Sequence, residues 1–226
     1  KWLNIHWNEG PYRQSERLNI YAKYLKELLD NGDAFYCFHS KEFLEKEAGL
    51  AHHCEFKKLP LEDLEKRLKK ENAVIRFKTP PDLEIAFIDL IRGEIRFNSD
   101  TLGGDFSLAK AESPDPPERL ASSSRAGKFL PLYNFAVVID DFEMNITHVI
   151  RGEDHISNTP RQIFIQQALK IPMPKYAHLP LILGSDRSKL SKRHDAVSID
   201  EYREMGYLPE ALVNFIAFLG WNPGTD

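Results

Sequence analysis

The sequence has little of several features that mark common protein classes. It holds two cysteines among 226 residues, which indicates a reducing compartment rather than a disulfide framework. It has no apolar run near eighteen residues and no cleavable leader, so we expect a soluble, cytoplasmic protein with no membrane partner. It has no excess of positive charge: the formal net charge is −4, so the chain as a whole lacks the electrostatic footprint of a nucleic-acid-binding protein.

The residues that are present indicate a globular protein with a substantial core. Hydrophobic residues make up 42% of the chain, which is enough for one large or two small cores. Positive charge is concentrated locally at 57–58, 66–70 and 187–193. Any contact with RNA would therefore use these local patches rather than the whole surface.

The densest of these patches is the basic loop at 187–193. Four cations, Arg187, Lys189, Lys192 and Arg193, fall within seven residues of it. Two lysines three residues apart, directly after a buried strand, can bring positive charge onto a polyphosphate as a bond to phosphorus breaks. A solvated basic surface loop is the alternative interpretation of an isolated Lys-x-x-Lys pair.

Local patterns predict an α/β fold. Continuous apolar runs at 135–139, 147–150 and 179–183 are typical of parallel strands covered on both faces. The strand–helix–strand–loop order between 133 and 193 fits half of a doubly wound nucleotide-binding fold, whose ligands lie beyond the carboxyl ends of the strands. Residues 33–130 indicate an α+β insertion, with a connector at 111–130. The other expected elements are a helix between Ser15 and Asn31, helices at 40–49, 61–70, 159–169, 198–206 and 211–219, strands at 34–38, 74–77 and 105–109, and a hairpin of 86–91 with 94–97.

Six stretches, taken together and in this order, resemble the catalytic region of bacterial glutamyl-tRNA synthetases, a class I family. The stretch Lys-Leu-Ser-Lys-Arg is similar to the second class I signature, usually written KMSKS. The resemblance covers more than two hundred residues, because the six stretches lie at 7–17, 133–141, 146–155, 178–181, 189–193 and 206–212.

This resemblance implies four parts in the chain. Residues 1–32 would belong to the first half of a Rossmann-like nucleotide-binding domain, and 33–130 to an insertion that binds the acceptor stem of tRNA. Residues 131–196 would form the second half with the lysine loop, and 197–226 the start of a helical stem-contact region. The family normally crosses the region of 111–130 with a short turn, so this sequence departs from the pattern there.

The resemblance also implies an ATP site and a glutamate pocket. Lys189 and Lys192 would be the catalytic cations, which bind the phosphates of ATP and stabilise the pyrophosphate leaving group, and Mg²⁺ would accompany the nucleotide as a cofactor. Tyr133 and Arg151 would bind the glutamate side chain, with the guanidinium gripping the carboxylate through two nitrogens. The implied ATP-binding residues are Asp154, His155, Leu181, Ile182, Lys189, Leu190, Ser191, Lys192 and Arg193.

Structural alternatives stay open for four of these positions. Arg151 would then form an ion pair with Glu153 or Asp154. Tyr133 would be a core tyrosine with a satisfied hydroxyl. Leu181 and its neighbour Ile182 are explained equally well by core packing.

The segments Cys37-Phe-His39 and His52-His-Cys54 invite a zinc interpretation. Some members of the family bind zinc here through a Cys-x-Cys and a Cys-x-His pair. This sequence has His39 in place of the second ligand and Phe56 in place of the last, and a shifted ligand, His52 or His53, would be needed. We therefore favour reduced structural cysteines and expect no metal.

The first class I signature, usually written HIGH, does not occur in residues 1–226, so we expect the chain to be a fragment that begins beyond it. The expected function is that of a glutamate–tRNA ligase, a monomer that activates L-glutamate with ATP and esterifies tRNA, with the fragment inactive alone. The alternatives are a glutaminyl-tRNA synthetase, a tRNA-modifying paralogue of the superfamily, or a non-catalytic tRNA-binding module built on 33–130. ATP binding distinguishes the last of these from the others.

Overall fold

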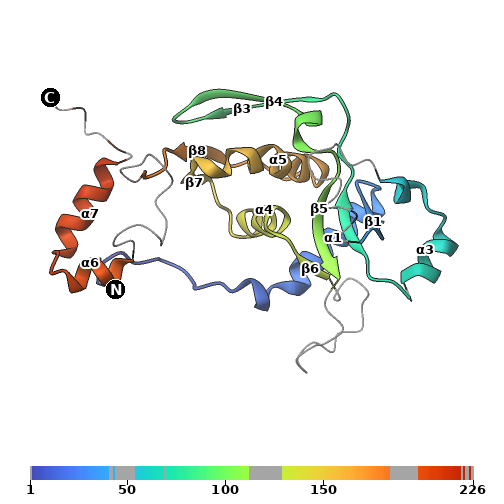
Figure 1. The fold of residues 1–226 in the computed structure, drawn as a ribbon, viewed down its shortest axis with the longest axis horizontal. Helices are drawn as coiled ribbons and strands as arrows, with labels where there is room; N and C mark the ends of the chain where they lie inside the picture. Colours follow the sequence, from blue (N-terminus) through green and yellow to red (C-terminus); the bar gives the residue numbers. More distant parts are fainter. Residues whose placement is uncertain are drawn as a thin grey trace.

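The computed structural model describes residues 2–40, 43, 54–68, 70–111, 129–183, 198–219, 221 and 224. These residues form two four-stranded sheets with helices packed around them (Figure 1). The lysine loop, most of the helix expected at 40–49 and most of the connector at 111–130 lie outside the described residues.

The first sheet is antiparallel throughout, in the order β1-β2-β5-β6. Its first three strands confirm the strands expected at 34–38, 74–77 and 105–109, whereas its fourth strand was not expected. The bounds are Ala34–Cys37 for β1, Val74–Phe77 for β2, Phe106–Ala111 for β5 and Phe129–Pro131 for β6.

The second sheet has the order β4-β3-β8-β7, and its strands are β3 (Glu84–Asp89), β4 (Gly93–Asn98), β7 (His148–Gly152) and β8 (Lys175–Leu179). The first two form the expected antiparallel hairpin. β7 runs parallel to β8, as the sequence predicted for a nucleotide-binding half. β3 also pairs in parallel with β8, where Asp89 lies opposite Tyr176. The hairpin is therefore part of the same sheet as strands that follow it by about fifty residues or more.

Two strand predictions were wrong. The apolar run at 135–139 lies in helix α4, Tyr133–Glu143, which packs against α1 (Leu18–Asp30) and α5 (Thr159–Ala168). A run of five apolar residues fits a buried strand or the buried part of a helix equally well, so periodicity cannot separate them. The strand expected at 179–183 instead ends at Leu179, because Pro180 has no backbone N–H to donate to a neighbouring strand.

The remaining helices follow the sequence closely. α1 begins at Leu18, slightly later than expected, and a 3₁₀ turn over Gln14–Glu16 precedes it. Ser198 caps α6 (Ile199–Glu204) with the expected capping box, in which the Glu201 amide donates to the Ser198 hydroxyl at 3.2 Å. The other two predicted helices are α3 (Leu61–Leu68) and α7 (Pro209–Phe218).

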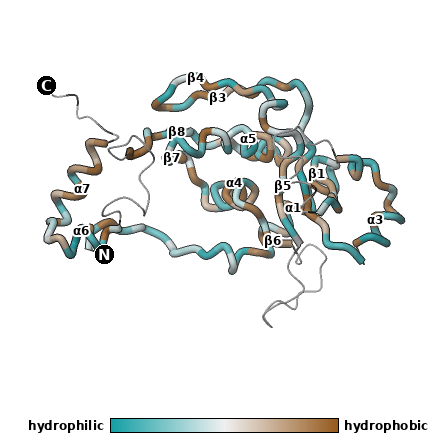
Figure 2. The backbone as a smooth tube through the Cα atoms, viewed as in Figure 1, coloured by the Kyte–Doolittle hydropathy of each residue, from teal (hydrophilic) through white to brown (hydrophobic). Residues whose placement is uncertain are grey.

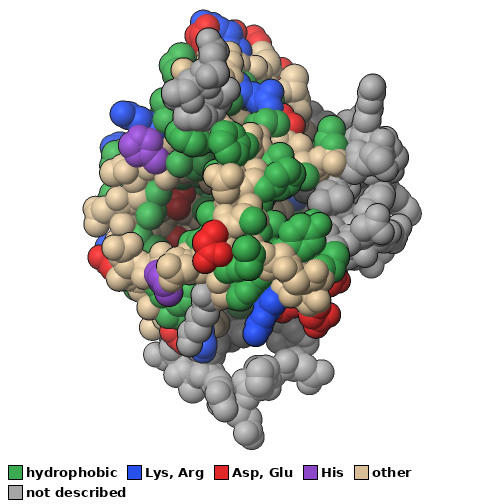
Figure 3. Space-filling view, turned by 90° about the vertical axis from the view of Figure 1, so that its left-hand side faces the viewer, with side chains coloured by type: hydrophobic (Ala, Val, Ile, Leu, Met, Phe, Trp, Pro, Cys, Tyr) green, Lys and Arg blue, Asp and Glu red, His purple; other side chains and the backbone are tan. Residues whose placement is uncertain are grey.

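One core runs through both sheets and the helices α1, α4 and α5. In contrast, α7 buries only Leu212 among its residues, although hydrophobic residues make up most of it (Figure 2). Its end of the molecule consequently displays exposed apolar side chains (Figure 3), including Leu208, Phe215, Phe218 and Trp221. No helix in the described part of the chain is both long and apolar enough to cross a membrane.

Candidate active site

Arg151 lies at the carboxyl end of the second sheet. It is the penultimate residue of β7, and in the parallel register it lies opposite His178 of β8. Parallel strands bring their carboxyl ends to one edge of a sheet, which is where ligands bind in folds of this kind. The expected position of Arg151 at such an edge is confirmed.

The guanidinium of Arg151 is held by uncharged groups. Its Nε donates to His178 Nε2 at 3.1 Å, and its Nη2 donates to the Thr159 hydroxyl at 2.7 Å and to Gln162 Oε1 at 2.9 Å. Its Nη1 lies 3.5 Å from the Tyr133 hydroxyl oxygen. The ring of Tyr176 lies beside the guanidinium, 5.5 Å from its central carbon.

Tyr133 is the first residue of α4, and 47% of it is exposed. This exposure excludes the alternative that it is a core tyrosine. Its ring also lies 5.3 Å from that of His155. The structure therefore brings Tyr133 and Arg151 together, as the glutamate-pocket hypothesis requires.

Glu153 does not take the role of ion-pair partner to Arg151. It belongs to a 3₁₀ turn over Glu153–Asn158 and forms its ion pair with Arg92 instead. Its other oxygen accepts the Leu181 amide at 3.2 Å. That amide hydrogen is consequently engaged, and Ile182 beside it is half exposed.

Asp154 and His155 lie on the same turn, at the same edge of the sheet as Arg151. The backbone oxygen of His155 is 3.5 Å from Arg151 Nη2. A Cβ at position 152 would approach Asp154 Oδ1 to 2.7 Å. A side chain at position 152 would therefore displace the carboxylate of Asp154.

Behind Arg151 lies a buried histidine–aspartate pair. His178 and Asp89 have fully buried side chains, with His178 Nδ1 2.6 Å from Asp89 Oδ2. Burial opposes the charge on Asp89, but hydrogen bonds from His178 and from the backbone amides of Arg92, Ile91 and His178 outweigh it. The pKa of Asp89 is therefore lowered, and its carboxylate is ionised.

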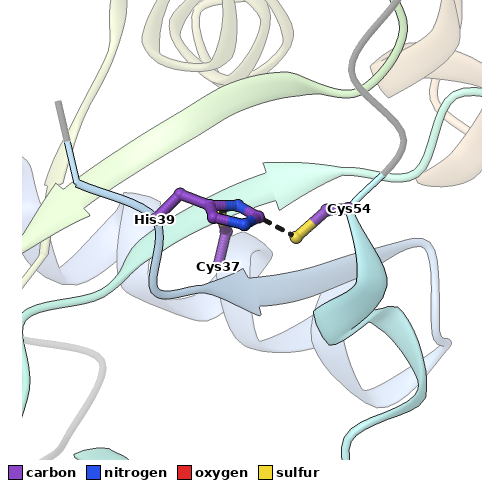
Figure 4. Close-up of side chains that lie close together, drawn as sticks. All are labelled: Cys37, His39 and Cys54. Carbon is purple, nitrogen blue, oxygen red and sulfur yellow. Dashed lines mark hydrogen bonds between the residues drawn. The ribbon is translucent and has the colours of Figure 1, made fainter. Parts of the chain in front are cut away.

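The cysteine cluster lies in the other sheet, around β1 (Figure 4). The Sγ atoms of Cys37 and Cys54 and a nitrogen of His39 lie within 4.8 Å of one another. His39 Nδ1 is 3.4 Å from Cys37 Sγ and 3.8 Å from Cys54 Sγ. A hydrogen bond from Cys54 lowers the pKa of Cys37 to about 5, and the same contact raises the pKa of Cys54.

These donors suit zinc in kind, since thiolate sulfur and imidazole nitrogen are its usual ligands. The described residues supply three of the four ligands that a structural zinc site needs. His52 and His53, either of which would be the fourth, lie outside the described residues. Phe56 instead packs its ring against that of His39, with 4.9 Å between centroids.

Comparison with known proteins identifies the family. The whole chain, residues 1–226, matches the family described as tRNA synthetases class I (E and Q), catalytic domain. The chain belongs to this synthetase family. It is 47% identical over its full length to a glutamate–tRNA ligase of Carboxydothermus hydrogenoformans and 49% identical to one of Aquifex aeolicus. It covers 47% and 46% of those proteins, respectively, so it spans about half the length of these relatives.

Solved structures agree with this assignment. A glutamate tRNA ligase from Elizabethkingia meningosepticum, crystallised in complex with its amino acid, superposes with a TM-score of 0.79 at 34% identity. The match covers 99% of this chain and 49% of that one. The class I synthetase fold predicted from the sequence is therefore confirmed. Class I synthetases generally use ATP with Mg²⁺.

Within this synthetase fold, the structure shows site residues that the sequence did not single out. Thr159, Gln162 and His178 contact Arg151, and Asp89 contacts His178, although only His178 belongs to a quoted motif. Exposed and buried residues alternate along β3, and Asp89 lies on the buried face with Ile85 and other apolar residues. An acidic residue at a buried position of this alternation was the signal in the sequence that could have identified it. The predicted residues 189–193 of the lysine loop lie outside the described part of the chain.

Proposed function

We propose that this chain carries part of the catalytic centre of a glutamate–tRNA ligase. In the reaction, an oxygen of the glutamate α-carboxylate attacks the α-phosphorus of ATP, and the bond to pyrophosphate breaks. A hydroxyl at the 3′ end of tRNA then attacks the carbonyl carbon of the adenylate, and AMP leaves as the ester forms. Lys189 and Lys192 stabilise the charge that develops on pyrophosphate. Arg151 and Tyr133 bind the side-chain carboxylate of glutamate.

The observation that supports this proposal most is the surroundings of Arg151. Its hydrogen-bond acceptors in the described part of the chain are uncharged, so none of them neutralises its charge by direct contact. The carboxyl group of Asp141 lies near enough to interact with that charge but accepts none of these hydrogen bonds. It lies next to a half-exposed tyrosine hydroxyl at the ligand-binding edge of the sheet. A carboxylate satisfies both groups, whereas the neutral carboxamide of glutamine leaves the positive charge uncompensated.

The four-part organisation expected from the sequence belongs to the same proposal. Residues 33–130 form the part that contacts the acceptor stem of tRNA, and 131–196 the half that binds ATP. Asp154, His155, Leu181 and Ile182 lie beside the nucleotide in this arrangement. The proposed enzyme is cytoplasmic and monomeric.

The test is ATP–pyrophosphate exchange by the full-length enzyme, with glutamate or glutamine as substrate and tRNA present. We expect exchange with glutamate and little with glutamine. Arg151→Gln should lower kcat/KM for glutamate by roughly 10²-fold, about the loss from one preorganised charged contact, with the KM for ATP nearly unchanged.

The matched control is Arg96→Gln, an exposed arginine of β4 paired with Glu84 and Glu94 on the surface. This control should retain wild-type kinetics, since exposed ion pairs contribute little. Equal losses of ATP and glutamate affinity in Arg151→Gln would contradict the role assigned to Arg151. Exchange that depends on glutamine instead of glutamate would contradict the proposed substrate.

A further inference from the structure

Asp89 and His178 have no assigned role, although they form the most deeply buried polar pair next to Arg151. Both side chains are fully inaccessible to solvent, so neither meets a substrate directly. They are nevertheless one and two hydrogen bonds away from the Arg151 guanidinium. Any effect of the pair on the pocket is therefore indirect, and its shortest route runs through that guanidinium.

The protonation of His178 follows from its two partners. An arginine is only a donor, so His178 Nε2 must accept the hydrogen of Arg151 Nε and carries no proton. An ionised aspartate is only an acceptor, so His178 Nδ1 must donate to Asp89 Oδ2 and carries the proton. His178 is therefore a neutral imidazole in the Nδ1–H tautomer. The Thr159 hydroxyl, 3.2 Å from Nε2, is compatible with the same tautomer.

This arrangement determines which guanidinium nitrogens remain open. Nε is engaged by His178, and the two hydrogens of Nη2 are engaged by Thr159 and Gln162. Among the described residues, Nη1 has only a long contact of 3.5 Å to the Tyr133 hydroxyl, on the exposed side of the group. A grip through two guanidinium nitrogens, as expected from the sequence, would require a ligand to displace one of the buried acceptors.

We propose that Asp89 and His178 are positioning residues, which fix the Arg151 guanidinium so that Nη1, beside the Tyr133 hydroxyl, receives the ligand carboxylate. One carboxylate oxygen then accepts from Nη1 and the other from the Tyr133 hydroxyl, so two side chains share the contact. This inference rests on the proposed function of the pocket. It adds the buried pair and the division of the carboxylate contact between two residues.

The tautomer is tested by NMR of this chain labelled with ¹⁵N-histidine. The eight histidines give a small set of imidazole signals, and the signal lost in His178→Gln identifies His178. We expect the Nδ1–H tautomer, with Nε2 unprotonated, at neutral pH. An Nε2–H tautomer or an imidazolium at that pH would overturn the proposal, whatever the enzyme assays show.

The positioning role is tested kinetically in the full-length enzyme with Asp89→Asn. An amide that keeps its oxygen on the backbone amides of Ile91 and Arg92 turns its –NH₂ towards His178, which favours the opposite tautomer. His178 would then present a hydrogen to Arg151 Nε, and the guanidinium would move. We expect KM for glutamate to rise about tenfold or more, with KM for ATP unchanged, because small displacements at a pocket have large effects.

The control for this experiment is Thr79→Val, which removes a buried hydrogen bond to Gly104 in a part of the fold remote from Arg151. If Asp89→Asn changes glutamate kinetics no more than this control does, the pair contributes to the fold but does not position Arg151.

Tyr133→Phe should raise KM for glutamate, and an unchanged value would contradict the shared contact. If the wild-type enzyme shows no glutamate-dependent exchange, the proposed function fails, while the NMR result still decides the tautomer. If Asp89→Asn does not fold, the wild-type spectrum and Tyr133→Phe remain decisive.

Discussion

At the scale of single residues, two neighbouring carboxyl groups on α4 have opposite surroundings. Asp140 accepts from Arg17 Nε at 2.7 Å and from the Tyr21 hydroxyl, so its charge is compensated. The pKa of Asp141 is raised to about 6. Burial is the main cause of this increase; the nearby charge of Arg151 opposes it, and the charge of Asp140 adds to it. The charged form of Asp141 is therefore disfavoured in the folded protein.

Asp141→Asn should stabilise the protein at neutral pH. The folded pKa, about 6, lies above the unfolded value of about 3.9, so the stability associated with protonated Asp141 is complete below about pH 4. This stability is lost as the pH rises through about 6. Asparagine cannot ionise, so Asp141→Asn avoids this loss in the free energy of unfolding, which is on the order of 1–2 kcal/mol after allowance for partial exposure.

Thermal unfolding measured at pH 4 and pH 7.5 checks this prediction. We expect Tm of Asp141→Asn to exceed that of the wild type by about 2–6 °C at pH 7.5 and to match it closely at pH 4. Asp140→Asn is the matched contrast and should lower Tm at pH 7.5, because it removes the acceptor of Arg17 and Tyr21. A lower Tm for both variants at pH 7.5 would contradict the assignment of the raised pKa.

The family resemblance pointed to Arg151 and Tyr133, and the sequence also shows Arg151 directly after an apolar strand, but neither signal identified the residues behind them. A charged residue that ends an apolar strand is visible in the sequence, because the strand and the charge are adjacent. Asp89 and His178 are 89 residues apart, and their contact depends on the pairing of β3 with β8. That pairing is a long-range property of the sheet, which no local period encodes.

At the scale of elements, the cysteine cluster joins the end of β1 to the 3₁₀ turn over Glu55–Lys58. Its geometry favours a metal more than the sequence alone did, because the three donor atoms already lie within 4.8 Å of one another. A thiol whose pKa is lowered is also readier to lose its proton to a metal.

We expect this chain to bind one equivalent of Co²⁺ or Zn²⁺ at the cluster formed by Cys37, His39 and Cys54. Titration with Co²⁺ should produce the sulfur-to-cobalt absorption band in the near ultraviolet and d–d bands in the visible range. His39→Ala and Cys54→Ser should each abolish or strongly weaken these bands. His148→Ala, an exposed histidine on β7, should leave them unchanged. Titration without any sulfur-to-cobalt band would show that the cluster is a reduced cysteine pair.

The elements themselves were predicted unevenly, for a physical reason. Turn and capping signals located the hairpin of β3 with β4 and the start of α6, because their chemistry is local. The type of the element at 135–139 was missed because Phe135, Ala136, Val138 and Ile139 are all buried. When most positions of a short segment face the core, a helix and a strand both have a continuous run of apolar residues, so the sequence pattern cannot distinguish them.

At the scale of the whole molecule, the hydrophobic core crosses the boundary that the sequence suggested at about residue 130. The core contains Ile75 and Leu108 of the first sheet together with Phe87 and Tyr176 of the second. The rings of Phe77 on β2 and Phe164 on α5 stack with 6.0 Å between centroids. The pairing of β3 with β8 adds backbone hydrogen bonds across the same boundary.

We therefore expect the two sheets to unfold together. Leu108 is fully buried on β5, and Leu108→Ala should lower stability by roughly 2–5 kcal/mol through lost burial and the cavity left behind. The variant should lower a single Tm by roughly 5–15 °C, seen equally in far-ultraviolet circular dichroism and in the hydrogen exchange of β7 and β8 amides.

Tryptophan fluorescence is a poor probe of this transition, because all three tryptophans lie near the ends of the chain; Trp7 and Trp221 are exposed and Trp2 is half-buried. Ile165→Ala on α5 provides the reciprocal variant, since Ile165 is fully buried on the other side of the boundary. Its destabilisation should appear equally in the β2 and β5 amides. Two separate transitions, with each variant shifting only its own, would mean that the segments 33–130 and 131–196 fold independently and that the shared core contributes little to their cooperativity.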